Sequence, residues 1–170
     1  IDASIRYRLN REWMLGGSYS YLDTEAQKYD TNHDRLVDDV IDGMAHHKGS
    51  WFATWNHDFS KCYHAGVGLY GRMSSKRYYQ INGDGKGYQI WRVTTNHEFP
   101  VSKKWLFRVE AGIDNIFNYV DDTPHGLHLG TTTPGRTIYG TLTIRFSQGK
   151  KLKFTNNNKS NFKSSENETD

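Results

Sequence analysis

The sequence predicts an all-β protein, an antiparallel transmembrane β-barrel, on three observations. Seven segments within residues 3–146 alternate strictly between apolar or aromatic residues and polar ones. Period two is typical of strands, whereas a helix would place apolar residues three and four apart. Only 35% of the residues are hydrophobic although 14% are aromatic, and a soluble domain normally has more apolar residues. The connections also alternate in length, as they do in bacterial outer-membrane barrels.

The first four segments each present one apolar face, which we expect to point outward. These outward sets are Ala3, Ile5, Tyr7 and Leu9; Trp13, Leu15, Gly17, Tyr19 and Tyr21; Trp51, Ala53, Trp55, His57 and Phe59; and Ala65, Val67, Leu69, Gly71 and Met73. The residues between them are mostly polar or small, which predicts an inner face that meets water.

The last three segments repeat the pattern. Their outward sets are Trp91, Val93, Thr95, His97 and Phe99; Trp105, Phe107, Val109, Ala111 and Ile113; and Ile138, Gly140, Leu142, Ile144 and Phe146. The inward positions include Arg92, Glu98 and Arg108. Unpaired charges would be costly in a dry sandwich core. In a wet lumen they would be solvated and paired across strands.

The lengths of the connections predict which end of the strands faces the periplasm and which faces outward. Residues 10–11, 60–63 and 101–104 are short connections, residues 24–47 and 119–136 are long, and residues 82–87 form a Gly-rich hairpin turn. Short connections belong on the periplasmic side and long ones outside. Aromatic residues flank both ends, as expected for rings at the two bilayer interfaces.

The chain divides into two parts. Residues 1–146 are predicted to be the C-terminal part of the transmembrane barrel, and residues 147–170 a polar periplasmic tail. The tail offers too little apolar surface to fold, so we expect disorder, with a short strand over residues 151–154 as the alternative. Because the chain opens inside a strand and without a secretory signal, we expect it to be a fragment or a processed piece.

Composition also argues against several classes of protein. No apolar run approaches the roughly 18 residues of a transmembrane helix. The single cysteine, Cys62, has no partner for an internal disulfide. The net charge of +3 is small and dispersed, which gives no indication of nucleic acid as a partner.

Five short motifs resemble those of TonB-dependent outer-membrane receptors. Residues 114–118 (DNIFN) are similar to the family's xNLF(D/N) segment, residues 134–139 (PGRTIY) to its PGR entry to the final strand, and residues 142–146 (LTIRF) to that strand's end. Upstream, residues 16–23 (GGSYSYLD) resemble GGYTYLDA, and residues 47–49 (HKG) resemble PxHKG. Each motif is weak alone, but their order and spacing together are fairly specific.

The resemblance implies a barrel of about 22 strands around an N-terminal plug. It implies high-affinity uptake of a large, scarce ligand (siderophore-iron, haem or cobalamin) in the bacterial outer membrane. This chain would supply the last seven strands without the plug, so it would not transport alone. Open strand edges are not tolerated in lipid, so other strands must close the barrel. The implied partners are outer-membrane lipid, the plug, the remaining strands, the TonB complex through the plug, and the barrel-assembly machinery.

The resemblance also suggests an insertion signal. Tyr139, Leu142, Ile144 and Phe146 keep the pattern of the terminal segment that the barrel-assembly machinery reads. Family members usually end at the terminal aromatic residue, whereas 24 residues follow Phe146 here.

Ligand contacts are expected in the long outer connections and the upper lumen. The candidates are Tyr29, His46, His47, Tyr78, Tyr79, His125 and His128. Aromatic and imidazole groups suit large amphipathic ligands, and haem iron takes histidine ligands. Histidines without fixed spacing are, however, more often plain polar loop residues.

We predict no resident metal, no cofactor and no enzymatic activity. Residues 30–34 (DTNHD) begin like a calcium loop, but Arg35 replaces the required glycine. His57 and Asp58 are adjacent in one strand and therefore face opposite sides, which argues against a catalytic triad with Ser60. Two other functions stay open: a plug-less porin or structural outer-membrane barrel, and a soluble β-sandwich binding module.

Overall fold

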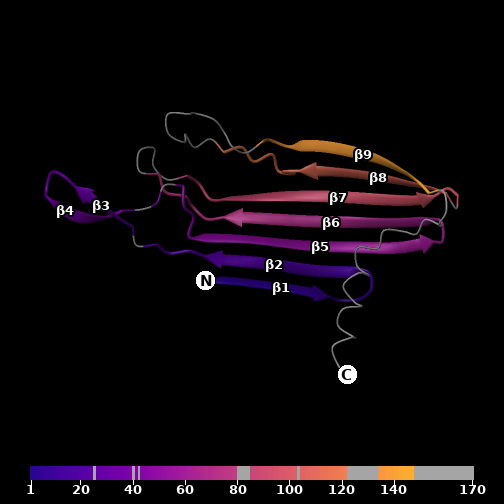
Figure 1. Ribbon diagram of the computed structural model, residues 1–170, viewed down its shortest axis with the longest axis horizontal. Coiled ribbons are helices and arrows are strands. Elements are labelled where there is room, and N and C mark those ends of the chain that lie inside the picture. Colours follow the sequence, from indigo (N-terminus) through magenta and orange to yellow (C-terminus); the bar gives the residue numbers. More distant parts are fainter. Residues whose placement is uncertain are drawn as a thin grey trace, which may run out of the picture.

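The computed structural model describes residues 1–24, 26–39, 41, 43–79, 85–102, 104–121 and 134–147. The strands of this part are β1 (Asp2–Arg8), β2 (Trp13–Tyr21), β3 (Ala26–Asp30), β4 (Arg35–Asp39), β5 (His47–Ser60), β6 (Tyr63–Ser74), β7 (Tyr88–Pro100), β8 (Trp105–Asp114) and β9 (Thr137–Phe146). Seven of them form one antiparallel sheet in the order β1-β2-β5-β6-β7-β8-β9 (Figure 1). The all-β, antiparallel prediction is confirmed.

The register keeps the predicted apolar positions that it pairs on one face. A single row of paired residues crosses all seven strands of the sheet: Tyr7, Leu15, Ala53, Leu69, Val93, Ile113 and Ile138. A slip of one residue at any pairing would move a whole strand's apolar set to the polar side. The predicted division into an apolar and a polar face is therefore present in the structure.

The connections alternate between the two ends of the sheet, as predicted. Residues 9–12, 61–62 and 101–104 turn at one end, which we call the short end. Residues 22–46, 75–87 and 115–136 connect strands at the opposite end, the long end. Figure 1 shows the short connections together on the right.

A second element, the β3–β4 hairpin, lies within the long connection between β2 and β5. The sequence prediction has no strands there, because each strand has only five residues and neither alternates cleanly. The turn between them places Asp34 at a φ of 51°, a left-handed conformation that Asp tolerates better than most residues. The hairpin projects away from the main sheet (Figure 1).

Little of the sheet is buried. The buried hydrophobic residues are Ala45, Ala65, Ile90 and Leu106, whereas Leu69, Val109 and Leu142 are 37%, 40% and 62% exposed on the apolar face. No described segment packs across that face. A soluble monomer rarely exposes so broad an apolar surface. The described part of the chain contains no helix that is long and apolar enough to cross a membrane.

Candidate functional site

Aromatic rings line the apolar face along the short end. We call this set the short-end row: Trp13, Trp55, Phe59, Tyr63, Phe99, Trp105 and Phe146. Ring centroids are 6.4 Å apart for Trp13 and Trp55, 5.0 Å for Tyr63 and Phe99, and 4.6 Å for Trp105 and Phe146. A register shift between Asp58 and Ser60 inserts an extra residue, and Phe59 stacks on Tyr63 at 5.2 Å. The row therefore extends from β2 to β9.

Polar groups within this row are bonded to one another. Glu12, in the first short connection, accepts hydrogen bonds from Trp55 Nε1 at 2.9 Å and pairs with His57 Nδ1 at 2.7 Å. The hydrogen bond from His57, followed by that from Trp55, lowers the pKa of the Glu12 carboxyl below its usual value. The Tyr63 hydroxyl lies 2.9 Å from His97 Nδ1. The row thus combines apolar rings with satisfied polar tips, which suits the boundary between hydrocarbon and water.

The polar face carries paired charges. Arg108 Nε donates to Glu98 Oε1 at 2.6 Å, and its Nη1 lies 3.4 Å from Glu110. Arg92 and Asp114 pair at 2.7 Å between β7 and β8. The inward charges singled out in the sequence are therefore paired across strands, as expected.

A buried ion pair joins two connections at the long end. Arg77 Nη2 donates to Asp121 Oδ2 at 2.6 Å, and their side chains are only 12% and 1% exposed. Arg77 also forms a reciprocal backbone pair with Gly85, at 2.9 and 2.6 Å. Its guanidinium lies 5.3 Å from the Tyr88 ring centroid, and Tyr88 stacks on Tyr119. Sequence reasoning missed this cluster, because no local pattern links residues 44 positions apart.

Two of the quoted motifs contact each other across the last long connection. Asn115, buried and at a φ of 52°, donates to the carbonyls of Tyr119 at 2.6 Å and Pro134 at 3.0 Å. Asn118 Oδ1 accepts from the Arg136 backbone at 2.8 Å, and Arg136 Nε donates to the Ile116 carbonyl. The DNIFN and PGR segments thus fix the two ends of this connection against each other.

Two predicted ligand residues, His46 and His47, lie together where β2 and β5 meet the long end. With Tyr21, Ser75 and Lys76 they line an open hollow of about 410 Å³. His46 Nδ1 lies 3.0 Å from the Leu22 carbonyl. His47 pairs with Tyr21 in register and lies 2.6 Å from the Tyr19 hydroxyl on the apolar face. His46 therefore lies at the long end just before β5, at a place that we call the rim, whereas His47 lies on the apolar face.

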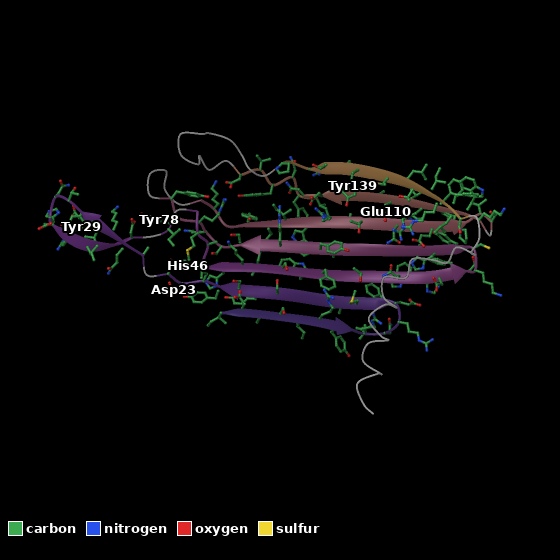
Figure 2. The ribbon with its side chains drawn as sticks, viewed as in Figure 1. Asp23, Tyr29, His46, Tyr78, Glu110 and Tyr139 are labelled. Atoms are coloured by element: carbon green, nitrogen blue, oxygen red, sulfur yellow. The ribbon has the colours of Figure 1, made fainter. Side chains whose placement is uncertain are left out.

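The predicted tyrosines fall into two groups. Tyr78 and Tyr79 lie beside the same rim: the Tyr78 carbonyl accepts from Gly43 at 2.7 Å, and the Tyr79 ring lies 5.9 Å from the Arg77 guanidinium. Tyr29 lies on the separate hairpin, where its hydroxyl contacts Asp34. Figure 2 shows Tyr29 apart from His46 and Tyr78. His125 and His128 lie outside the described residues.

In the turn between β3 and β4, the side chains of the calcium-like motif form hydrogen bonds within the turn itself. Asp30 accepts from the Asn32 backbone at 3.0 Å and pairs with His33 Nδ1 at 2.7 Å. The hydrogen bond from His33, then that from Asn32, lowers the pKa of the Asp30 carboxyl. Within the described residues, no three His, Cys, Asp or Glu side chains are grouped so that they could hold a metal ion.

The predicted insertion signal occupies β9, an edge strand of the sheet. Leu142, Ile144 and Phe146 lie on the apolar face, opposite Val109, Phe107 and Trp105. Tyr139 lies on the other face, over Gly112, where an added Cβ would come within 2.4 Å of its ring. Figure 2 shows Tyr139 and Glu110 on this part of the sheet. The tail beyond Ser147 lies outside the described residues.

Comparison of the chain with protein-family models, with curated proteins and with solved structures finds no match. The geometry of the described residues therefore defines the candidate site. That geometry consists of an apolar face with a ring-lined short end, a reverse face of paired charges, and a long end where Arg, His and Tyr side chains gather.

Proposed function

We propose that this chain forms the last seven strands of a TonB-dependent outer-membrane receptor that takes up siderophore-iron, haem or cobalamin. One observation carries the membrane part of the proposal. A single apolar face crosses seven strands in register and stays largely exposed or half-exposed, while the reverse face holds ion pairs. Burying one Leu or Val side chain is worth roughly 1.5–3 kcal/mol, so such a face favours hydrocarbon over water.

Closure of the barrel follows from the same reasoning. β1 and β9 are the two edges of the sheet and are not paired with each other. Backbone groups at an open edge find no water in a bilayer, so further strands must pair with both edges. In the proposed receptor those strands, about 15 of a 22-stranded barrel, come from the rest of the protein, together with the plug that the TonB complex pulls.

The receptor part of the proposal rests on the motifs and on the long end. The DNIFN and PGR segments resemble those of the family and contact each other in the structure. At the rim, His46, Tyr78 and Tyr79 offer imidazole and phenol groups to a large ligand, and we keep Tyr29, His125 and His128 as further candidates on the connections. Selectivity among the three ligand classes would be set there and by the plug.

Conductance and uptake measured on the full-length protein test this proposal. After purification from outer membranes and insertion into planar bilayers, a plugged receptor should give no stable large conductance. Cells should take up one of three probes (a ferric siderophore, haem or cyanocobalamin) saturably, and only when TonB is present. A steady open-pore conductance without saturable uptake would support the porin alternative. A protein that stays monomeric in water without detergent would overturn both.

Substitution at the rim tests the ligand candidates in the same uptake assay. We expect His46→Ala combined with Tyr78→Ala, and separately His125→Ala combined with His128→Ala, to raise the half-saturating concentration of the transported probe. Cys62→Ala, exposed in a connection at the opposite end of the sheet, is the control. Unchanged half-saturation in both double variants would remove these residues from the ligand site.

A further inference from the structure

We infer that the short end of the sheet binds the headgroups of anionic phospholipids. The inference rests on the proposed function, because it requires the apolar face to lie in a bilayer. It goes further by assigning a lipid class to one end of the protein.

Every short connection carries at least one exposed cation. Arg11, Lys61 and Lys104 are exposed, one in each connection, and Lys103 adds a fourth positive charge in the sequence. None of the three exposed side chains forms an ion pair with the rest of the described chain. These charges are therefore available to an external anion.

The only acidic residue in residues 9–12, 61–62 and 101–104 is Glu12. Its two carboxylate oxygens are engaged by Trp55 and His57, at 2.9 and 2.7 Å. The Glu12 carboxylate is thus bonded to the aromatic row and forms no ion pair with Arg11, Lys61 or Lys104. The short end keeps an excess of positive charge.

Each of the three cations is one or two residues away from a ring of the short-end row. Lys104 directly precedes Trp105, Lys61 is two residues from both Phe59 and Tyr63, and Arg11 is two residues from Trp13. Because an extended chain rises about 3.3 Å per residue, the backbone of each cation lies within roughly 7 Å of the backbone of a ring in the short-end row. Rings at the edge of the hydrocarbon with cations just beyond them match a lipid whose acyl chains end at a phosphate. A free phosphate would use the cations but not the rings.

The opposite end has the opposite charge pattern. Residues 22–46, in the longest described connection, contain seven acidic residues and two basic ones: Asp23, Glu25, Asp30, Asp34, Asp38, Asp39 and Asp42 against Lys28 and Arg35. An anionic headgroup would be repelled there. Over all three long connections, residues 22–46, 75–87 and 115–136, ten acidic residues stand against six basic ones, so the asymmetry favours the short end for the phospholipid.

Lipid selectivity can be measured by electron spin resonance on the full-length protein in phosphatidylcholine vesicles. Spin-labelled phosphatidylglycerol and spin-labelled phosphatidylcholine report the fraction of lipid immobilised at the protein surface. We expect the wild type to prefer phosphatidylglycerol, and the triple variant Arg11→Gln, Lys61→Gln and Lys104→Gln to lose that preference. A single basic residue near an anionic surface changes association by about fivefold, so the preference should fall by more than that in the triple variant.

The matched control removes three positive charges from the long end: Lys28→Gln, Arg35→Gln and Lys86→Gln. It should keep the wild-type preference, and added salt should weaken the preference in both proteins. If the inserted wild type shows no preference, or if the short-end variant keeps it, the inference is wrong while the receptor proposal stands. If no immobilised lipid is detected at all, the protein does not present its apolar face to a bilayer, and the proposed function fails as well.

Discussion

The two ends of one sheet are built in different ways. At the short end, rings follow one another at neighbouring register positions, such as Trp105 beside Phe146, and most of them stay exposed or half-exposed. At the long end, Arg77 and Asp121 come from separate connections and are almost completely buried. The first arrangement follows from alternation along strands. The second depends on long-range contacts that only the folded chain brings together.

This difference predicts different tolerance to substitution. Replacing an exposed ring removes its stacking on neighbouring rings and little other stabilising free energy. A buried charge that loses its partner keeps the full penalty of desolvation. The long end should therefore be the more sensitive of the two, and substitutions of graded severity can test that ranking.

The largest effect should come from Asp121→Asn. Arg77 would then keep a buried guanidinium without its carboxylate, and removing one partner of a buried pair costs about 3–5 kcal/mol. We expect amide hydrogen exchange at Arg77 and Gly85, which bond to each other, to accelerate by about 100-fold or more. Mass-spectrometric exchange on the detergent-solubilised protein measures this.

The matched control is Asp114→Asn, which breaks the pair with Arg92. Those side chains are 33% and 49% exposed, so the expected loss is about 0–1 kcal/mol. Equal exchange rates in the two variants would contradict the claim that the long end is held by its buried pair.

The strands and their faces could be predicted because one rule, period two, acts at every residue. Leu69 and Val93 were placed on the same face from alternation alone, and the register pairs them. The ends of the strands were less accurate. The alternating pattern starts at Trp51, whereas the resemblance of residues 47–49 to the PxHKG strand start points to an earlier beginning. β5 begins at His47, and Lys48 and Gly49 continue the ladder with Ser74 and Met73. Backbone pairing with β6 therefore extends β5 beyond the segment in which its own residues alternate.

The parts that could not be predicted lack any local pattern. Arg77 looks like one of several loop cations, and nothing near it in the sequence indicates Asp121. Residues 30–34 in the β3–β4 hairpin are rich in turn formers, but they also resemble the start of a calcium loop, so the sequence alone favours neither. The sequence likewise predicts the candidate site only as a set of loop residues. The structure separates Tyr29 and turns His47 toward the apolar face.

An intermediate effect should come from Gly71→Ala, within the strands. An added Cβ would lie 2.2 Å from the Trp51 ring, which packs edge-on against Trp91 at 5.0 Å. The ring would have to move, and such overpacking costs about 1–3 kcal/mol. Gly140→Ala, on the same face, is the control, because its nearest contact is 3.8 Å away. Urea unfolding of the reconstituted protein should show a lower midpoint for the first variant only, and equal midpoints would refute the close packing of Trp51.

The smallest effect should come from Glu12→Gln at the short end, and it is seen by comparing the thermal stability of the wild type and the variant at two pH values. Because bonding to His57 and Trp55 lowers the pKa of Glu12, its carboxylate contributes stability above the ordinary glutamate pKa of about 4.3. That contribution is lost as the pH falls through the lowered pKa. The wild type should therefore lose more thermal stability than the variant when the pH is lowered from about 5 to about 3, a range that includes the ordinary glutamate pKa. Tryptophan fluorescence measures both melting curves, and parallel losses would show that the bonds to Glu12 contribute nothing to the short end.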